Sequence, residues 1–173
     1  KKKTKFQLVE KIIVKTPNFL KKKSFVIMDG KFMCIDPCEN KEFSIIGNVK
    51  KTIHAENINY KPKFNKVYDK LLFNYHNTEK TFSKFKEINE DYKFFFDRTK
   101  DLKYVSSFFV IRCTRPFKEK TDERLTHINI QENIISLFSG KWVSCFEAAN
   151  KVLKVINWLR IKKKLEFMEK GDG

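Results

Sequence analysis

Apolar positions separated by polar ones near the start of the chain, at Phe6, Leu8, Ile12 and Val14, indicate the period of two that is typical of β-strands. Two of the apolar runs, 24–28 and 31–35, flank the dipeptide Asp29-Gly30. Such a dipeptide favours a two-residue hairpin turn, because the turn requires backbone conformations with positive φ. We therefore expect residues 5–60 to form an antiparallel sheet.

The period changes to that of an α-helix between residues 63 and 100. Apolar side chains recur there at helical spacing, at Val67, Leu71 and Leu72 and again at Phe82, Phe85 and Ile88. Lysines occupy other positions, so we expect two amphipathic helices that cover one face of the sheet. The run Phe94-Phe95-Phe96 is expected to close the second helix against the sheet.

The last third of the chain predicts strands followed by one long helix. Tyr104–Cys113 is typical of a strand, and the segments 127–130 and 134–138 predict a hairpin. From Val143 to Leu159 apolar residues recur at helical spacing, which predicts an amphipathic helix of about five turns. The expected fold class is therefore α+β, with an antiparallel or mixed sheet and covering helices.

The composition narrows the classes of function. The chain has 173 residues, a hydrophobic fraction of 41% and 18 phenylalanines, which argues against disorder. Its formal net charge is +16, which favours nucleic acid or an anionic surface as a partner. Only five of the 37 basic residues are arginine, however, and a genome rich in A and T produces many lysines without selection for a basic face. On that ground a nucleic-acid partner is not the first expectation.

Neither the cysteines nor the apolar segments indicate a metal site, a signal peptide or a membrane span. The four cysteines form no C-x-x-C pair and lack nearby histidines, so we expect buried thiols in a reducing cytoplasm and no metal site. Phe6–Leu20 is interrupted by charges, which argues against a signal peptide. No apolar run approaches the roughly 20 residues that a membrane span needs, so a cytoplasmic protein is expected.

Several motifs follow one another between Tyr104 and Ile156. They are a Phe-rich strand ending in arginine, an Arg-Pro pair, a polar bridge, a glycine turn and a closing helix: Phe108-Phe109-Val110-Ile111-Arg112, Arg115-Pro116, Thr121-Asp122-Glu123-Arg124, Ser139-Gly140-Lys141, and the helix that holds Cys145 and Ala148-Ala149. This order resembles the C-terminal end of FAD-dependent oxidoreductases of the D-amino-acid-oxidase (DAO) type.

The resemblance implies a division of the chain into two parts. Residues 1–125 would correspond to the substrate domain, and residues 126–173 to the hairpin and helix that return to the FAD-binding domain. Ser139, Gly140 and Lys141 would then bind the cofactor, because a glycine turn before a helix lets the backbone approach the flavin and offers free N–H groups.

The resemblance also implies that half of the enzyme is missing. The G-x-G-x-x-G loop that seats the FAD pyrophosphate does not occur in the sequence, which begins with lysine rather than methionine. We expect the C-terminal part of an oxidoreductase that passes a hydride from an amino acid or amine to flavin. FAD binding would then require an N-terminal complement chain.

Arginine is the residue type that would hold such a substrate. Arg112 resembles the arginine on the substrate-facing strand of DAO-type enzymes, where the planar guanidinium pairs with a carboxylate through two parallel hydrogen bonds. Arg115 is the competing assignment, because it precedes Pro116 and matches the Arg-Pro pair of the family. His54 and His127 are candidate acid–base or flavin-edge groups, although lone histidines are more often packed or solvated.

Two other functional hypotheses stay open. The first is a non-enzymatic basic α+β module that binds RNA or another polyanion, because lysines combined with aromatic side chains hold single strands by charge and stacking. The second is a truncated product without activity.

Overall fold

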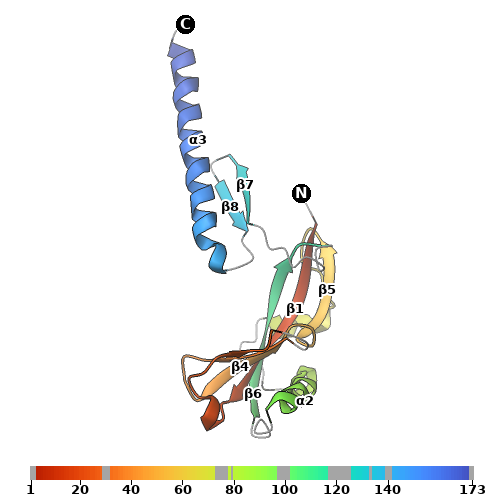
Figure 1. Cartoon of the computed structure of the whole chain (residues 1–173). Coiled ribbons are helices and arrows are strands. Elements are labelled where there is room, and N and C mark those ends of the chain that lie inside the picture. Colours follow the sequence, from red (N-terminus) through yellow and green to blue (C-terminus); the bar gives the residue numbers. More distant parts are fainter. Residues whose placement is uncertain are drawn as a thin grey trace. The chain divides into compact units, whose positions relative to one another are not determined.

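The chain folds into two compact units in a computed structural model, Lys1–Pro116 (unit 1) and Phe117–Gly173 (unit 2). The structure describes residues 3–28, 32–72, 78, 80–96, 102–116, 126–132, 134–138 and 142–171. Both units combine strands and helices, which confirms the expected α+β class (Figure 1).

Unit 1 is built on a six-stranded antiparallel sheet. Its strands are β1 (Thr4–Lys15), β2 (Phe25–Val26), β3 (Met33–Pro37), β4 (Phe43–Asn48), β5 (Ile53–Asn59) and β6 (Lys103–Thr114). The order is β2-β3-β4-β1-β5, with β6 paired to β1. The long strand β1 pairs with β6 along one edge and with β5 and then β4 along the other, so it organises the whole sheet.

The predicted hairpin is present. Strands β2 and β3 pair antiparallel, with Phe25 opposite Ile35 and Val26 opposite Cys34. The predicted turn at Asp29-Gly30 lies outside the described residues.

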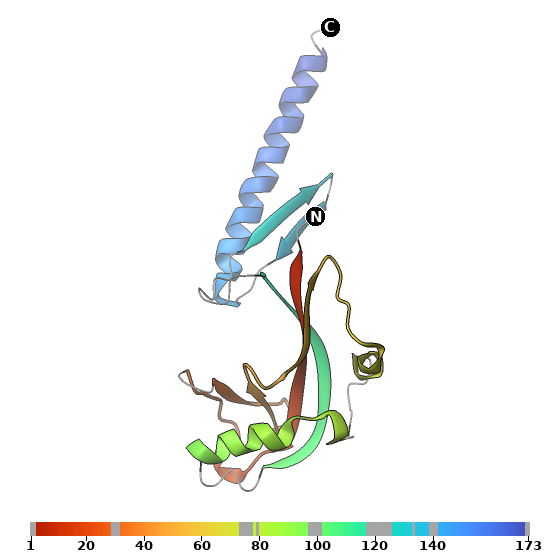
Figure 2. The same cartoon turned by 90° about the vertical axis from the view of Figure 1, so that its right-hand side faces the viewer.

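Short helical segments connect β5 to β6. They are η2 (Lys66–Tyr68), α1 (Asp69–Leu72), η3 (Lys80–Phe82) and α2 (Phe85–Phe95); a further turn, η1 (Asn18–Leu20), follows β1. The first expected helix is only one turn long in α1. Figure 2 shows α2 lying across the lower part of the sheet.

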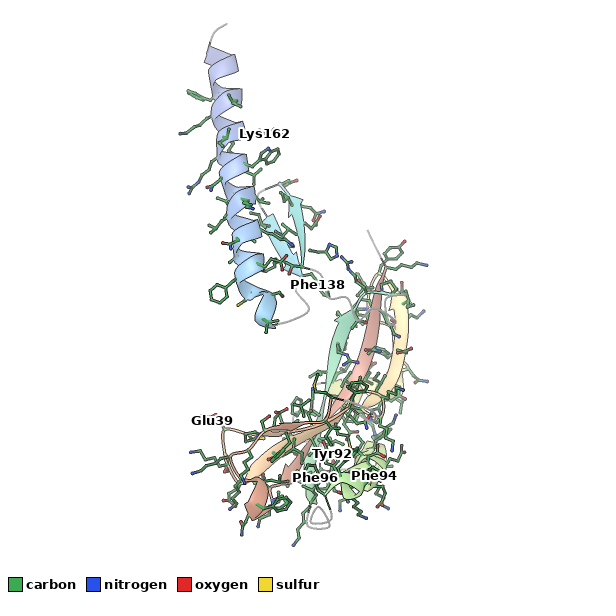
Figure 3. All side chains as sticks on the ribbon, in the orientation of Figure 1. Glu39, Tyr92, Phe94, Phe96, Phe138 and Lys162 are labelled. Carbon is green, nitrogen blue, oxygen red and sulfur yellow. The ribbon has the colours of Figure 1, made fainter. Side chains whose placement is uncertain are left out.

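The helices pack on one face of the sheet. Leu8, Ile12 and Val14 point to this face from β1, where they meet side chains of α1 and α2. The hydroxyl of Tyr92 reaches across the core and hydrogen-bonds the carbonyl oxygens of Cys34 and Gly47, the latter at 3.0 Å (Figure 3). We call this surface the core face, and it confirms the expectation of covering helices.

The phenylalanine run at the end of α2 behaves differently from the expectation. Phe96 packs against the core and makes an edge contact with the ring of Phe25. Phe94 is 75% exposed and Phe95 is 40% exposed. Successive residues of a helix point about 100° apart, so three in a row cannot all face the sheet.

Unit 2 consists of a hairpin and a helix. Strands β7 (His127–Gln131) and β8 (Ile134–Phe138) pair antiparallel, as predicted, and η5 (Trp142–Ser144) leads into α3 (Cys145–Gly171). The helix has 27 residues and extends well beyond the apolar pattern that predicted it. In the described part of the chain, no helix is both long and apolar enough to cross a membrane.

Candidate functional site

A buried polar cluster surrounds Glu10 on the core face. One carboxylate oxygen of Glu10 accepts a hydrogen bond from the backbone N–H of Lys84 at 3.0 Å and lies 2.9 Å from Nε2 of His54. The other oxygen accepts a hydrogen bond from the hydroxyl of Ser107 at 2.5 Å. Glu10 is 0% exposed, and the side chain of His54 is 7% exposed. A carboxylate only accepts hydrogen bonds, so Nε2 of His54 carries a proton.

An irregularity in the sheet places His54 in this cluster. The register between β1 and β5 shifts between Leu8 and Val9, where Leu8 lies opposite Ala55 and Val9 opposite Ile53. The extra residue is His54, and such a bulge redirects a side chain. Its ring turns to the core face, where it also makes an edge contact with Phe109 at 5.1 Å between ring centroids.

The hydrogen bonds keep Glu10 charged inside the protein. Burial raises the pKa of a carboxyl group, but hydrogen bonds from His54, Ser107, Ser83 and the backbone of Lys84 outweigh burial here. The pKa of Glu10 therefore lies below its ordinary value. Glu10 connects β1 to β5, to β6 and to the start of α2, so the cluster locks the sheet to its helical cover.

The cluster lacks the arrangement of a nucleophilic site. A hydroxyl nucleophile needs a neighbouring base, and that base needs a third group to orient it. Here the hydroxyl of Ser107 donates to Glu10, the same carboxylate that holds His54. His54, a candidate acid–base group, thus has a structural partner. In the described residues no group of three His, Cys, Asp or Glu side chains could hold a metal ion.

Arg112 lies on the opposite face of the sheet, which faces away from the core. Its Nε and Nη2 both donate to the side-chain oxygen of Gln7, at 2.9 and 2.7 Å. Gln7 in turn donates to Glu56 at 2.9 Å, and Glu56 also pairs with Lys5 at 3.2 Å. A carboxylate ligand at Arg112 would have to displace Gln7 from the guanidinium.

The other predicted site residues are spread over both units. Arg115 follows the end of β6 and is half-buried, and His127 begins β7 and is exposed. Ser139, Gly140 and Lys141 lie outside the described residues.

A basic surface occupies the face of the sheet opposite the core. Side chains alternate along a strand and residues directly opposite share a face, so the register assigns its members. We call it the basic face, and its cationic members on β1 and β6 are Lys5, Lys11, Lys15, Lys103 and Arg112. Phe43 and Phe108 lie among them and are half-buried, and Glu56 and Asp36 are acids on the same face.

Two lysines of this face lie directly opposite each other. Lys15 on β1 pairs with Lys103 on β6, and both are exposed. Like charges in this position destabilise a sheet. Lys15 is also close enough to Glu42 to contribute, after Lys21, to a lowered pKa of that carboxyl group. A bound anion would relieve the repulsion between Lys15 and Lys103.

Glu10 was not expected from the sequence, although a signal for it exists. Leu8, Glu10 and Ile12 alternate with the same period, so an acid occupies a position that the pattern assigns to the core. A charged residue there requires buried partners. The sequence pattern does not show which partners, because they come from β5 and β6.

Comparisons of the chain with protein-family models, with curated proteins and with solved structures found no match. The resemblance to DAO-type enzymes stays a prediction.

Proposed function

We propose that unit 1 is a nucleic-acid-binding module that holds a single strand on the basic face. The observation that carries the proposal is the placement of five cations and two phenylalanines on the sheet face opposite the helices. Positive side chains that follow a backbone, combined with aromatic rings for stacking, are the usual elements of a single-strand site.

The charge of the chain is concentrated in this unit. Residues 1–116 contain 26 basic and 13 acidic residues, a net charge of +13 out of +16 for the whole chain. A potential of this size attracts polyanions and accelerates their association. The charge alone supports any polyanion, whereas the aromatic rings favour nucleic acid.

The geometry of β1 suits an extended ligand. Lys5, Lys11 and Lys15 share one face of the strand, and Lys5 and Lys15 lie about 33 Å apart along it at the usual rise per residue. Phe108 lies opposite Lys11 on β6, and Phe43 lies opposite Lys15 on β4. The ammonium groups of Lys11 and Lys15 would contact phosphates, and the rings lie where bases could stack on them.

The test is binding of a fluorescent single-stranded oligonucleotide, followed by anisotropy at several salt concentrations. The double variant Lys15→Ala/Lys103→Ala is expected to bind about tenfold more weakly and to reduce the slope of log affinity against log salt by about 1.4, since two phosphate contacts are lost. The matched control is Lys66→Ala/Lys86→Ala, which removes two exposed lysines from η2 and α2.

Equal losses in the two double variants would show that the oligonucleotide responds only to total charge, and the proposed site would be wrong. Absence of binding by the unmodified chain at low salt would also refute the proposal.

A flavoenzyme of the DAO type is the second candidate function. It is favoured by the order of β6, the β7–β8 hairpin and α3, which follows the order that the resemblance implies. The substrate would be an amino acid or amine, and Arg112 or Arg115 would hold its carboxylate. Flavin absorbance that co-purifies with the chain from its native cells would support this candidate, and a flavin-free native preparation would remove it.

A further inference from the structure

Apolar residues occur on several sides of α3, and two stripes of them differ in their exposure. The first stripe contains Ala148, Val152, Val155, Ile156 and Leu159, which are buried or half-buried. The part of α3 that carries the first stripe lies beside the β7–β8 hairpin in both views (Figures 1 and 2). The hairpin offers its own apolar positions, among which Ile128 and Ile135 are half-buried. The first stripe therefore belongs to the packing of unit 2.

The second stripe contains Trp158, Ile161 and Leu165. At about 100° per residue these side chains lie within about 60° of one another, and their centre is about a third of a turn from that of the first stripe. Their exposed fractions are 56%, 59% and 55%. Three large apolar side chains in a row that remain half exposed indicate a docking surface.

The helix around this stripe is strongly basic. The segment from Asn150 to Leu165 holds six cations and no acid, namely Lys151, Lys154, Arg160, Lys162, Lys163 and Lys164. At the same helical spacing Lys162 borders the stripe on one side and Lys164 on the other. The ammonium group of Lys162 lies over the ring of Trp158, 5.7 Å from its centroid. The charge around the stripe therefore favours an anionic occupant.

We propose that the second stripe of α3 docks on an anionic lipid bilayer, with the helix lying in the plane of the interface. An apolar stripe between lysines fits this position, because lysine stems follow the apolar surface while their ammonium groups reach lipid phosphates. Tryptophan is enriched at the membrane–water interface, at the level of the lipid head groups. The inference is independent of the basic face of unit 1.

Other occupants fit the observations less well. A second copy of the helix would bring two basic borders together, and like charges repel. A protein groove deep enough to cover the stripe would also bury Lys162 and Lys164, whose desolvation opposes binding. A bilayer surface leaves both ammonium groups at the level of the phosphates.

The test uses the full chain with Trp142→Phe, so that Trp158 is the remaining tryptophan. Vesicles of phosphatidylcholine with and without phosphatidylglycerol are titrated, and flotation is combined with tryptophan fluorescence. We expect binding and a blue shift of Trp158 only with phosphatidylglycerol, weakened by salt. The double variant Ile161→Ser/Leu165→Ser is expected to weaken vesicle binding by at least about tenfold. The control is Phe146→Ser/Leu153→Ser, two exposed apolar residues on another side of α3.

Several results would overturn the proposal. One is the absence of binding to phosphatidylglycerol vesicles, and another is an equal loss in the control variant. A third is a concentration-dependent dimer in sedimentation experiments that Ile161→Ser/Leu165→Ser abolishes, which would assign the stripe to a second copy. A fourth is loss of oligonucleotide affinity in that variant, which would assign the stripe to nucleic acid. Circular dichroism verifies that each variant keeps its helix.

Discussion

Replacement of Glu10 by glutamine tests whether the buried cluster holds unit 1 together. The substitution keeps the size of the side chain but removes the charge and one of the two acceptor oxygens. The new amide can turn its oxygen toward the two donors, the N–H of Lys84 and Nε2 of His54, and its NH2 group toward the hydroxyl of Ser107, which can accept. All three hydrogen bonds are then kept, but none of them is made to a charged group.

The expected loss of stability follows from these contacts. A hydrogen bond to a charged group contributes about 1.5–3 kcal/mol, whereas one between neutral groups contributes about 0.5–1.5 kcal/mol. Each of the three bonds loses about 1 kcal/mol, so we expect the free energy of unfolding to fall by about 3 kcal/mol at neutral pH. This is a large part of the stability of a typical domain.

Urea unfolding followed by circular dichroism measures the effect, and Glu42→Gln is the matched control. Glu42 is an exposed acid whose carboxylate accepts a hydrogen bond from Lys21 at 2.6 Å, so its replacement is expected to change the free energy of unfolding little.

The dependence on pH gives a second readout. The pKa of Glu10 is lowered in the folded state. The contribution of Glu10 to the free energy of unfolding is therefore complete above the unfolded pKa of about 4.5, and it is lost as the pH falls through the folded pKa. The difference between the unmodified chain and Glu10→Gln should therefore stay constant near neutral pH and shrink in acid. If Glu10→Gln loses no more stability than Glu42→Gln, or if the difference does not shrink in acid, the assignment of the cluster as the lock of the sheet is wrong.

Three further substitutions test the packing of α2 and of the turn after β4, each by urea unfolding. Tyr92→Phe removes the hydroxyl that bonds two strand carbonyls and should cost about 2 kcal/mol, whereas Tyr60→Phe at a 55% exposed position should be neutral. Asn48→Ala removes the acceptor of two backbone N–H groups and a buried bond to α2, with an expected cost of about 2–3 kcal/mol; Asn40→Ala on the surface is its control. Gly47→Ala should destabilise by about 1 kcal/mol, because the new Cβ would lie 3.1 Å from a cysteine sulfur; an unchanged midpoint would show that the sulfur moves aside.

The strands could be predicted from the sequence because their signals, alternation or a short β-branched and aromatic run, are local. The strand 104–113 and the hairpin 127–138 were expected within a residue or two of β6 and of β7 with β8. The segment 127–131 alternates apolar and polar residues, whereas 104–113 and 134–138 are short runs rich in aromatic and β-branched residues.

The pairing of β1 could not be predicted in the same way. The pairing of one strand with three partners depends on the register of each pair. That register in turn depends on turns and on side chains far away in the sequence. Glu10 shows the consequence. Its burial is visible in the alternation, but its partner Ser107 comes from a strand almost one hundred residues later. Arg112 was expected to hold a substrate, but no local pattern indicates that Gln7, more than one hundred residues earlier, lies opposite it.

The two faces of β1 contribute to the protein in opposite ways. On the core face, Glu10 is held by hydrogen bonds that stabilise the fold. On the basic face, Lys15 and Lys103 lie opposite each other at a cost in stability. A pair of like charges is more readily understood if an anionic ligand compensates it, as the proposed single strand would. Stability and nucleic-acid affinity should then respond to different residues of the same strand, and Glu10→Gln should weaken the fold while leaving the affinity of the folded fraction unchanged.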